Sequence, residues 1–540
     1  EATMRKLLLT LFVLLLSFIL IACGSNKPHN VDIIIDNIEK GYTTLKFDVI
    51  VTDEEHNLEG KAVILELIDQ DEKIVYTKNL ELEVETHNIS ISSLTKNTTY
   101  TLKIKGTAFK KPVVLYNEEI RTKDDVVIKI STVEQFFNIK NDIEGNYELA
   151  NDIDFKDVKI TNANQVTEFR GVFDGKGYAI KNYHIESYNA YTGVFGRVTN
   201  YGEIKNLVID GITMGTNEKP LTVDGIFYGG LLAGQVNNIN ASISNIVIKN
   251  SSVNIVSQTT SSSVYLGGAV GYFVGKATNI SSENTTINAT YARGGSFHLG
   301  GLIGGTPNLT SAESTSFSKL ASGTDLNLKV QILSATSNRN HLFYIGGAIG
   351  FLRNNKASNL SDIYATGNLN IAEVTMKSAS NSANKVENTK LIMNIGGVVG
   401  RTGSNNLVNA KAFGSNAFFS GVITFKHDAF ELVEGSSVTR TFNIGGLVGE
   451  QDNSLDINRS VVNGTITVDV IDVEDITLNI GAVAGKRSHA ISTFNKDKIA
   501  ITSIVELVLN SEVLETEDVL LTNDANTIFT SDYMKAAFEK

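Results

Sequence analysis

The chain has one cysteine, four prolines and no tryptophan among its 540 residues. The single cysteine, Cys23, excludes an internal disulfide and any metal site built from several cysteines. The formal net charge of −12 argues against a nucleic-acid partner, because binding to phosphates requires a basic surface. The chain has 45 glycines but only four prolines. Since ordinary turns use both residue types, this imbalance predicts a repeated corner that requires glycine itself.

Motifs of common catalytic and cofactor sites are also missing from the sequence. There is no His-Glu-x-x-His zinc motif and no Gly-x-Ser-x-Gly elbow. Residues 271–276 and 481–486 end in Gly-Lys, but each has three residues between its glycines and no Ser or Thr after the lysine, as a phosphate loop would need. The histidines are scattered, and His298, which alternates with Phe297 and Leu299, is expected to point outward into solvent. We therefore expect no catalytic residue, cofactor or metal.

The N-terminus has a charged start followed by an apolar run. Basic residues at 5–6 precede an almost unbroken apolar stretch at 7–22, which is short for a membrane span of about 20 residues but suits a secretory signal. The run ends in Leu20-Ile-Ala-Cys23-Gly. This order resembles the lipobox of bacterial lipoproteins, which implies a signal peptide at 1–22, diacylglycerol on Cys23 and an extracytoplasmic chain anchored to the cell membrane. The alternative is a plain signal peptide with an incidental cysteine.

After a polar tether at 23–30, residues 31–122 show several short runs that alternate apolar and polar positions. The expected strands lie at 43–51, 62–67, 73–77, 88–92 and 113–116. Several short strands within one small segment predict a β-sandwich.

One stretch of this segment resembles the fibronectin type III pattern. Leu94 stands six residues before Tyr100, which opens another alternating run. In that family the tyrosine hydroxyl bonds back to the backbone at a strand corner. Because the core tryptophan common in such modules is missing, an immunoglobulin-like variant is equally compatible. The segment has no Arg-Gly-Asp tripeptide and is interpreted as a spacer.

The rest of the chain is organised around a recurring block of two glycines, two aliphatic residues and one glycine. Its copies are Gly267-Gly-Ala-Val-Gly271, Gly300-Gly-Leu-Ile-Gly304, Gly346-Gly-Ala-Ile-Gly350, Gly396-Gly-Val-Val-Gly400 and Gly445-Gly-Leu-Val-Gly449, with looser copies at 229–234 and 481–485. Two alternating runs and a loop of variable length precede each copy. This pattern predicts a solenoid coil of strand, loop, strand and glycine corner, in which glycine permits positive φ and close backbone approach.

The segment before these blocks resembles the entry to a known repeat fold. Residues 131–137 begin with a predicted Ser131–Glu134 capping box, and glycine-containing strand segments follow at 169–182, 193–196 and 202–210. The series resembles the right-handed parallel β-helix of bacterial surface proteins with GLUG repeats, and similar regions of the zinc metallopeptidases that cleave immunoglobulin A, whose peptidase domain is absent here.

The expected fold class is therefore all-β. It comprises an N-terminal immunoglobulin/fibronectin III-like β-sandwich, a right-handed parallel β-helix at 123–510 whose first coil is capped by a helix at 131–137, and a C-terminal cap or tail at 511–540.

One pair of carboxylates invites a catalytic interpretation. Asp152 and Asp154 lie two residues apart in a strand-like run, so both point to one face about 6.6 Å apart, a separation suited to inverting glycoside hydrolysis. The alternative is that both belong to a structural first coil.

The polar positions suggest where a ligand would bind. Outward positions rich in Asn, Ser and Thr at 238–245 and 279–288 are expected to form solvated ladders; the alternative is a flat polar face for glycans or protein backbone. Inserted loops at 311–325, 377–390 and 426–438 are the better candidates for recognition. The favoured function is a non-catalytic, membrane-anchored adhesin or ligand-binding scaffold with a host or cell-surface glycan or protein as partner. The alternatives are a carbohydrate-active enzyme (a polysaccharide hydrolase or lyase) and a purely structural envelope component.

Overall fold

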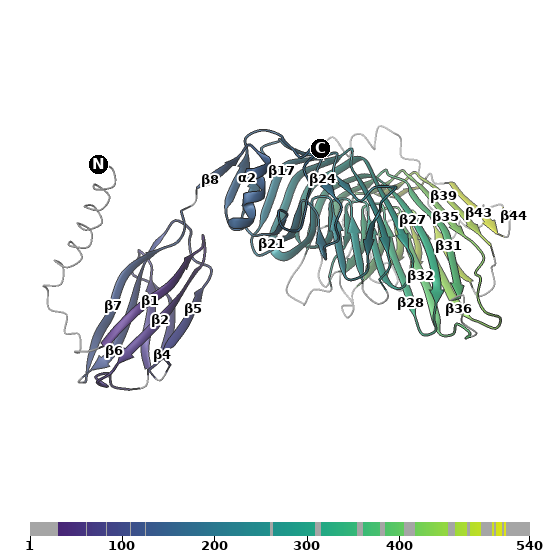
Figure 1. Ribbon diagram of the computed structural model, residues 1–540. Helices are drawn as coiled ribbons and strands as arrows, with labels where there is room; N and C mark the ends of the chain where they lie inside the picture. The colour runs from purple at the N-terminus through teal and green to yellow at the C-terminus, as the bar shows by residue number, and fades with distance from the viewer. Residues whose placement is uncertain are drawn as a thin grey trace. The chain divides into compact units, whose positions relative to one another are not determined.

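The computed structural model (Figure 1) describes two compact units, which meet in sequence between Val126 and Val127. The described residues are 31–514 without 61, 83, 109, 125, 260–262, 308–314, 354–359, 379–383, 404–415, 452–459, 472–475, 488–498, 502–503 and 510–511. The predicted signal peptide, Cys23 and the tether lie outside the described residues, as does the predicted tail apart from 512–514.

The first unit consists of antiparallel strands in two sheets, with the orders β1-β2-β5 and β4-β3-β6-β7. Their bounds are β1 (Val31–Lys40), β2 (Leu45–Asp53), β3 (Ala62–Ile68), β4 (Ile74–Glu81), β5 (Thr86–Ile91), β6 (Thr99–Ala108) and β7 (Lys111–Arg121). Alternation explains the strands: in β2, Leu45, Phe47 and Val49 are buried while the residues between them are not. The buried side chains of both sheets form one hydrophobic cluster.

A hydrogen bond expected from the sequence is present in this unit. The Tyr100 hydroxyl accepts a bond from the backbone N–H of Thr95 at 2.8 Å, just before β6 begins. Tyr100 is otherwise buried, so this bond satisfies a polar group that has left water and ties the preceding turn to the strand.

The second unit starts with β8 (Val127–Ile130), the short helix α2 (Val133–Phe137) and the 3-10 helix η1 (Asn138–Asn141). The predicted capping box is shifted by one residue. Thr132, not Ser131, is the N-cap, and its side chain accepts a bond from the backbone of Gln135 at 3.2 Å. Ser131 with Glu134 and Thr132 with Gln135 both match the capping-box pattern. The helix begins after Thr132, and in this register Phe136 faces the core.

No helix among the described residues is long and apolar enough to cross a membrane.

A parallel sheet of eight strands forms one side of this unit, in the order β15-β20-β23-β25-β28-β32-β36-β40. Their bounds are β15 (Tyr191–Thr192), β20 (Phe227–Gly230), β23 (Val264–Gly267), β25 (Gly295–Gly300), β28 (Asn340–Gly346), β32 (Thr389–Gly396), β36 (Val438–Gly445) and β40 (Ile476–Gly481). Each strand comes from a different copy of the repeat, and in Figure 1 β28, β32 and β36 lie side by side in sequence order.

The other strands belong to one continuous sheet of 29 strands. Its first part contains β8, β9 (Asn146–Leu149), β10 (Ile153–Asp154), β11 (Val166–Phe169), β12 (Val172–Asp174), β13 (Ala179–Lys181), β14 (His184–Ile185), β16 (Phe195–Val198), β17 (Glu203–Asp210), β18 (Thr213–Met214) and β19 (Leu221–Val223). Its second part contains β21 (Ala233–Lys249), β22 (Ser252–Ser257), β24 (Val270–Tyr291), β26 (Ile303–Gly305), β27 (Ser316–Ala335), β29 (Ile349–Arg353), β30 (Leu360–Ala365), β31 (Leu369–Ser378), β33 (Val399–Gly403), β34 (Ala417–Phe419), β35 (Val422–His427), β37 (Val448–Gln451), β38 (Ser460–Val462), β39 (Thr465–Val470), β41 (Ala484–Arg487), β42 (Ile499–Ile501), β43 (Ile504–Leu509) and β44 (Glu512–Leu514).

The unit is a parallel β-helix, as the repeat predicted. One coil shows the path: β23 ends at Gly267, the chain turns at Gly268 and Ala269, and β24 returns through the larger sheet. Equivalent residues of successive coils pair in parallel register, such as Leu266 with Leu299. Inward residues of the coils between Ile130 and Val483 form a single buried cluster. At the far end β44 pairs antiparallel with β43, so the parallel stacking stops there among the described strands.

One of the predicted recognition loops, 311–325, is largely strand, whereas 426–438 is mostly loop. Most of 311–325 belongs to β27, because Phe317 and Leu320 are buried and pair with β24. Within 426–438, β35 continues to His427, and Phe430 and Leu432 then pack against the core. The loop prediction was wrong for 316–325, because it took a run of small polar residues as loop although the inward positions are apolar, whereas residues 428–437 lie outside the strands as predicted.

Candidate functional site

The glycine corner is shaped by backbone contact rather than by backbone angle. A Cβ atom on Gly346 would lie 1.9 Å from the carbonyl oxygen of Ile349, and one on Gly350 would lie 2.4 Å from that of Gly304. Real Cβ atoms do not approach other atoms so closely. None of the glycines of the five blocks has a positive φ, unlike Gly275 on β24. Positive φ was therefore the wrong part of the prediction, and close backbone approach was the right part.

An aromatic ladder runs along the outer side of the eight-stranded sheet, next to this corner. It consists of Tyr191, Tyr228, Tyr265, His298 and Tyr344, one from each successive strand. The ring centroids of neighbouring rungs lie between 4.0 Å and 5.4 Å apart. Side chains that follow the corner close over this ladder.

Two of these covering side chains are themselves aromatic. Tyr272 meets the Tyr265 ring edge-on at 5.1 Å, and Phe351 stacks on Tyr344 at 4.4 Å. The tight glycine turn brings the strand before the corner close to the strand after it. Aromatic rings from both strands therefore pack against each other on the outer side of the turn.

His298 is therefore not the solvated side chain that alternation predicted. It does point away from the core, yet only 1% of it is exposed, because it lies between Tyr265 and Tyr344 and against Phe351. Burial, with a smaller contribution from the Arg353 guanidinium, lowers the pKa of His298 well below its usual value. The imidazole is neutral at physiological pH and serves as a rung of the ladder.

The same row of positions becomes polar in the later coils. Asn394, Asn443 and Asn479 continue it. The Asn443 amide donates to the Asn394 carbonyl oxygen and the Asn479 amide donates to the Asn443 carbonyl oxygen, both at 2.7 Å. Beside them, Glu450 lies 3.2 Å from the Arg401 guanidinium and 3.0 Å from the Lys486 ammonium. Asn394 and Asn443 are fully buried, and the bonds between the asparagines hold neighbouring coils in register, although the Asn394 amide nitrogen has no partner among the described residues.

The two carboxylates considered for catalysis are held by hydrogen bonds. Asp152 accepts from the Ala179 backbone at 2.9 Å and lies 2.5 Å from the Lys181 ammonium. Asp154 accepts from the Asn182 amide at 2.8 Å and from the Lys156 backbone at 2.9 Å. The bond from Lys181 lowers the pKa of Asp152, and the bond from Asn182 lowers the pKa of Asp154. Both are ionised and tie the first coil to the next.

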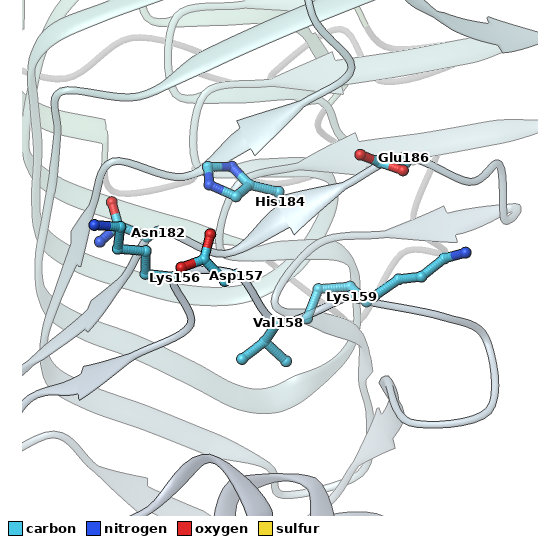
Figure 2. Close-up of a pocket in the computed structure, with 8 residues that line it drawn as sticks. Lys156, Asp157, Val158, Lys159, Asn182, His184 and Glu186 are labelled. Carbon is cyan, nitrogen blue, oxygen red and sulfur yellow. The ribbon is translucent and has the colours of Figure 1, made fainter.

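A cavity of about 740 Å³ opens beside this pair (Figure 2), and its lining contains charges of both signs. The residues around it include Lys156, Asp157, Lys159, Asn182, His184 and Glu186. In Figure 2, Glu186 is drawn well apart from Asp157, and the Lys159 side chain extends away from His184. The Nδ1 atom of His184 lies 2.7 Å from the Thr213 hydroxyl. Sequence reasoning missed this cavity, because its wall comes from separate coils.

An outer asparagine ladder lies on another face of the β-helix. It consists of Asn254, Asn288, Asn327 and Asn370, whose amides donate to the preceding carbonyl oxygens at 2.8, 2.9 and 3.4 Å. The predicted outward asparagines at 238–245 and 279–288 form ladders of the same kind, such as Asn245 with Asn279 at 2.9 Å. The structure therefore places these amides in organised rows.

The described parts of the remaining predicted loops are stacked on each other. The Val386 carbonyl accepts from the Ser437 backbone at 2.8 Å, and the Val386 N–H donates to the Ser436 hydroxyl at 2.9 Å. Lys377, at the end of β31, pairs with Glu431 at 2.7 Å. These segments extend the coils instead of projecting from them. Among the described residues, no group of three or more histidine, cysteine, aspartate or glutamate side chains is placed to hold a metal ion.

Comparisons with known proteins give little further information. No protein-family model matches the chain, and no curated protein matches it. One similar solved structure is the family 28 exopolygalacturonase of Yersinia enterocolitica, with 8% identity, a TM-score of 0.17, and coverage of 90% of this chain and 100% of that one. Another is pectate lyase PelI from Erwinia chrysanthemi in complex with tetragalacturonic acid, with 10% identity, a TM-score of 0.12, and coverage of 58% and 84%. At these TM-scores neither likeness bears on function.

Proposed function

We propose that this chain is a non-catalytic lipoprotein of the bacterial cell surface, whose β-helix is a scaffold that binds a glycan or protein. The lipobox pattern around Cys23 supports the anchor, and the Thr95–Tyr100 bond supports a fibronectin III-like or immunoglobulin-like spacer. The glycine blocks at the coil corners support a right-handed helix of the GLUG type. In this proposal the protein is extracytoplasmic, with its lipid in the cell membrane.

The observation that carries the non-catalytic proposal is the state of Asp152 and Asp154. Glycoside hydrolysis by two carboxyl groups needs one of them protonated as the general acid, and such a group has a raised pKa. Here hydrogen bonds lower both pKa values, and each carboxylate connects neighbouring coils. The pair is therefore suited to holding the coils together rather than to donating a proton.

The catalytic alternative is tested by incubating the full-length chain with a panel of neutral and acidic polysaccharides. We expect saturable binding to some member of the panel and no released sugar, measured as new reducing ends or as unsaturated products. Asp152→Asn and Asp174→Asn form a matched pair of variants, because Asp174 likewise accepts from a backbone N–H and lies near a lysine ammonium, 3.9 Å from that of Lys176. Release that Asp152→Asn abolishes and Asp174→Asn preserves would establish the enzyme instead. Neither binding nor release would favour the structural envelope component.

The anchor is tested at Cys23. In Cys23→Ala the sulfur that would carry diacylglycerol is missing, so we expect the protein to move from the membrane fraction to the medium and to lose incorporation of a labelled fatty acid. Because the substitution changes only the proposed anchor residue, we expect the released chain to unfold at the same urea concentration as the wild type. Unchanged lipid labelling in the variant would show that the anchor is elsewhere or absent.

A further inference from the structure

The outer asparagine ladder borders a groove of about 270 Å³. Its floor is the outer face of three consecutive strands, β22, β24 and β27, and the turn at 215–220 forms a wall at one end. The lining includes the amides of Asn254, Asn288 and Asn327, the hydroxyl of Thr290, and aliphatic surface from Pro220 and Val256. A concave surface with aliphatic patches and a few placed polar groups is the usual form of a small-ligand site.

The asparagines that line this groove keep hydrogen-bonding capacity beyond the bonds of the ladder. An amide oxygen can accept two bonds, and the oxygens of Asn288 and Asn327 each accept one from the next asparagine along. The Asn327 amide nitrogen donates one of its two hydrogens to the Asn288 oxygen, so its second hydrogen can donate to a ligand. The Thr290 hydroxyl has no hydrogen bond to the described residues. Because the ladder holds the amide planes in place, these groups are ordered before any ligand arrives, which lowers the entropic cost of binding.

The charge of the groove argues for a neutral ligand. The cation in its lining is Lys329, whose ammonium lies 2.6 Å from the Glu373 carboxylate. Glu373 also accepts a bond from Gln331. With its positive charge already paired, the groove offers no strong attraction to a carboxylate or phosphate.

The floor of the groove also argues against an extended peptide. A peptide that adds to a sheet pairs with an edge strand, whereas β22 is paired with β18 and β24, and β24 with β27. The backbone groups beneath the groove are therefore occupied. What remains are carboxamide and hydroxyl groups beside aliphatic carbon, which match the hydroxyl groups and C–H faces of a sugar.

We propose that this groove binds a short stretch of a neutral glycan, with sugar hydroxyls donating to the ladder carbonyl oxygens and accepting from Asn327 and Thr290. The inference rests on the proposed binding function and locates it on the outer sheet face instead of on the predicted loops. The small volume of about 270 Å³ limits the bound portion to a short stretch of the glycan.

The test is isothermal titration calorimetry of the full-length chain with cellohexaose, mannohexaose and xylohexaose as neutral probes and hexagalacturonate as the acidic comparison. We expect at least one neutral probe to bind saturably and hexagalacturonate to bind more weakly. Thr290→Trp places an indole in the groove and should weaken neutral binding at least about tenfold. Thr278→Trp is the matched control, because Thr278 also points outward from β24 but lies outside the groove, and its binding should equal that of the wild type.

Unfolding midpoints verify that both variants are folded, and Thr290→Arg replaces Thr290→Trp if the latter is not. The inference is wrong if no neutral probe binds, if only hexagalacturonate binds, or if Thr290→Trp binds as the wild type does. Binding that persists in Thr290→Trp would leave the scaffold function in place and move its site elsewhere. If neither these probes nor the wider polysaccharide panel binds, the scaffold function loses its support as well.

Discussion

Replacing Gly350 by alanine is expected to lower the free energy of unfolding by at least about 3 kcal/mol. The new Cβ would lie 2.4 Å from the carbonyl oxygen of Gly304 and 2.8 Å from the backbone nitrogen of Leu299. Both atoms belong to strands that are paired within the β-helix, so neither can move without breaking the register of neighbouring coils. A single methyl group should therefore disrupt several coils.

The effect is measured by urea denaturation followed by circular dichroism, with hydrogen exchange to show which coils open, since a solenoid can unfold in parts. Gly225→Ala is the matched control. Its Cβ would meet only the end of the Tyr188 side chain, at 2.9 Å from the hydroxyl oxygen, and that side chain can move aside. If Gly350→Ala and Gly225→Ala unfold at the same urea concentration, the corner does not depend on backbone contact.

The second large effect is expected at the cap of the first coil. Phe136 on α2 is fully buried and contacts the rings of Phe155, Phe173 and Phe195, with centroids 5.4, 6.0 and 5.9 Å away. Phe136→Ala should cost about 3–5 kcal/mol of stability, because it leaves a ring-sized cavity in a cluster of aromatic side chains. It should also promote aggregation, since the open end of a solenoid exposes its core when the cap is loosened.

Phe137→Ala is the control on the same helix. Phe137 is only partly buried and packs against the edge of the cluster, so its loss should cost clearly less. Thermal unfolding and light scattering of the two variants provide the comparison. Equal destabilisation by both substitutions would show that α2 lies on the first coil without Phe136 anchoring it.

Much of the fold was predictable because its signals are local. Alternation in β2 and β6 requires only the residues of one strand. The fibronectin type III resemblance carried by Leu94 and Tyr100 implied the bond that the Tyr100 hydroxyl accepts at the start of β6. Strand β1 was missed. It lies at the edge of its sheet with Ile34 and Ile38 exposed, so it lacks the regular alternation that a half-buried strand displays.

The candidate sites were less predictable, because they depend on side chains from separate coils. The 740 Å³ cavity combines residues near 156–160 with residues near 182–186, and the asparagine groove combines the turn at 215–220 with three later strands. A sequence signal for the outer ladder does exist, since asparagines recur in the alternating runs. The lengths of the loops between coils vary, however, and they conceal which asparagines stand next to each other.

The sequence by itself determined that glycine corners separate coils and that Val, Ile and Leu face inward, because both follow from residues close together in the chain. Only the tertiary structure decided whether the outward side chains next to each corner are buried or exposed to solvent. His298 and its counterparts Tyr265 and Tyr344 hold the same place before their glycine blocks, and alternation correctly predicts that they point outward. Whether an outward side chain meets water depends on the next strand. The glycines bring that strand so close that the imidazole is buried between aromatic rings.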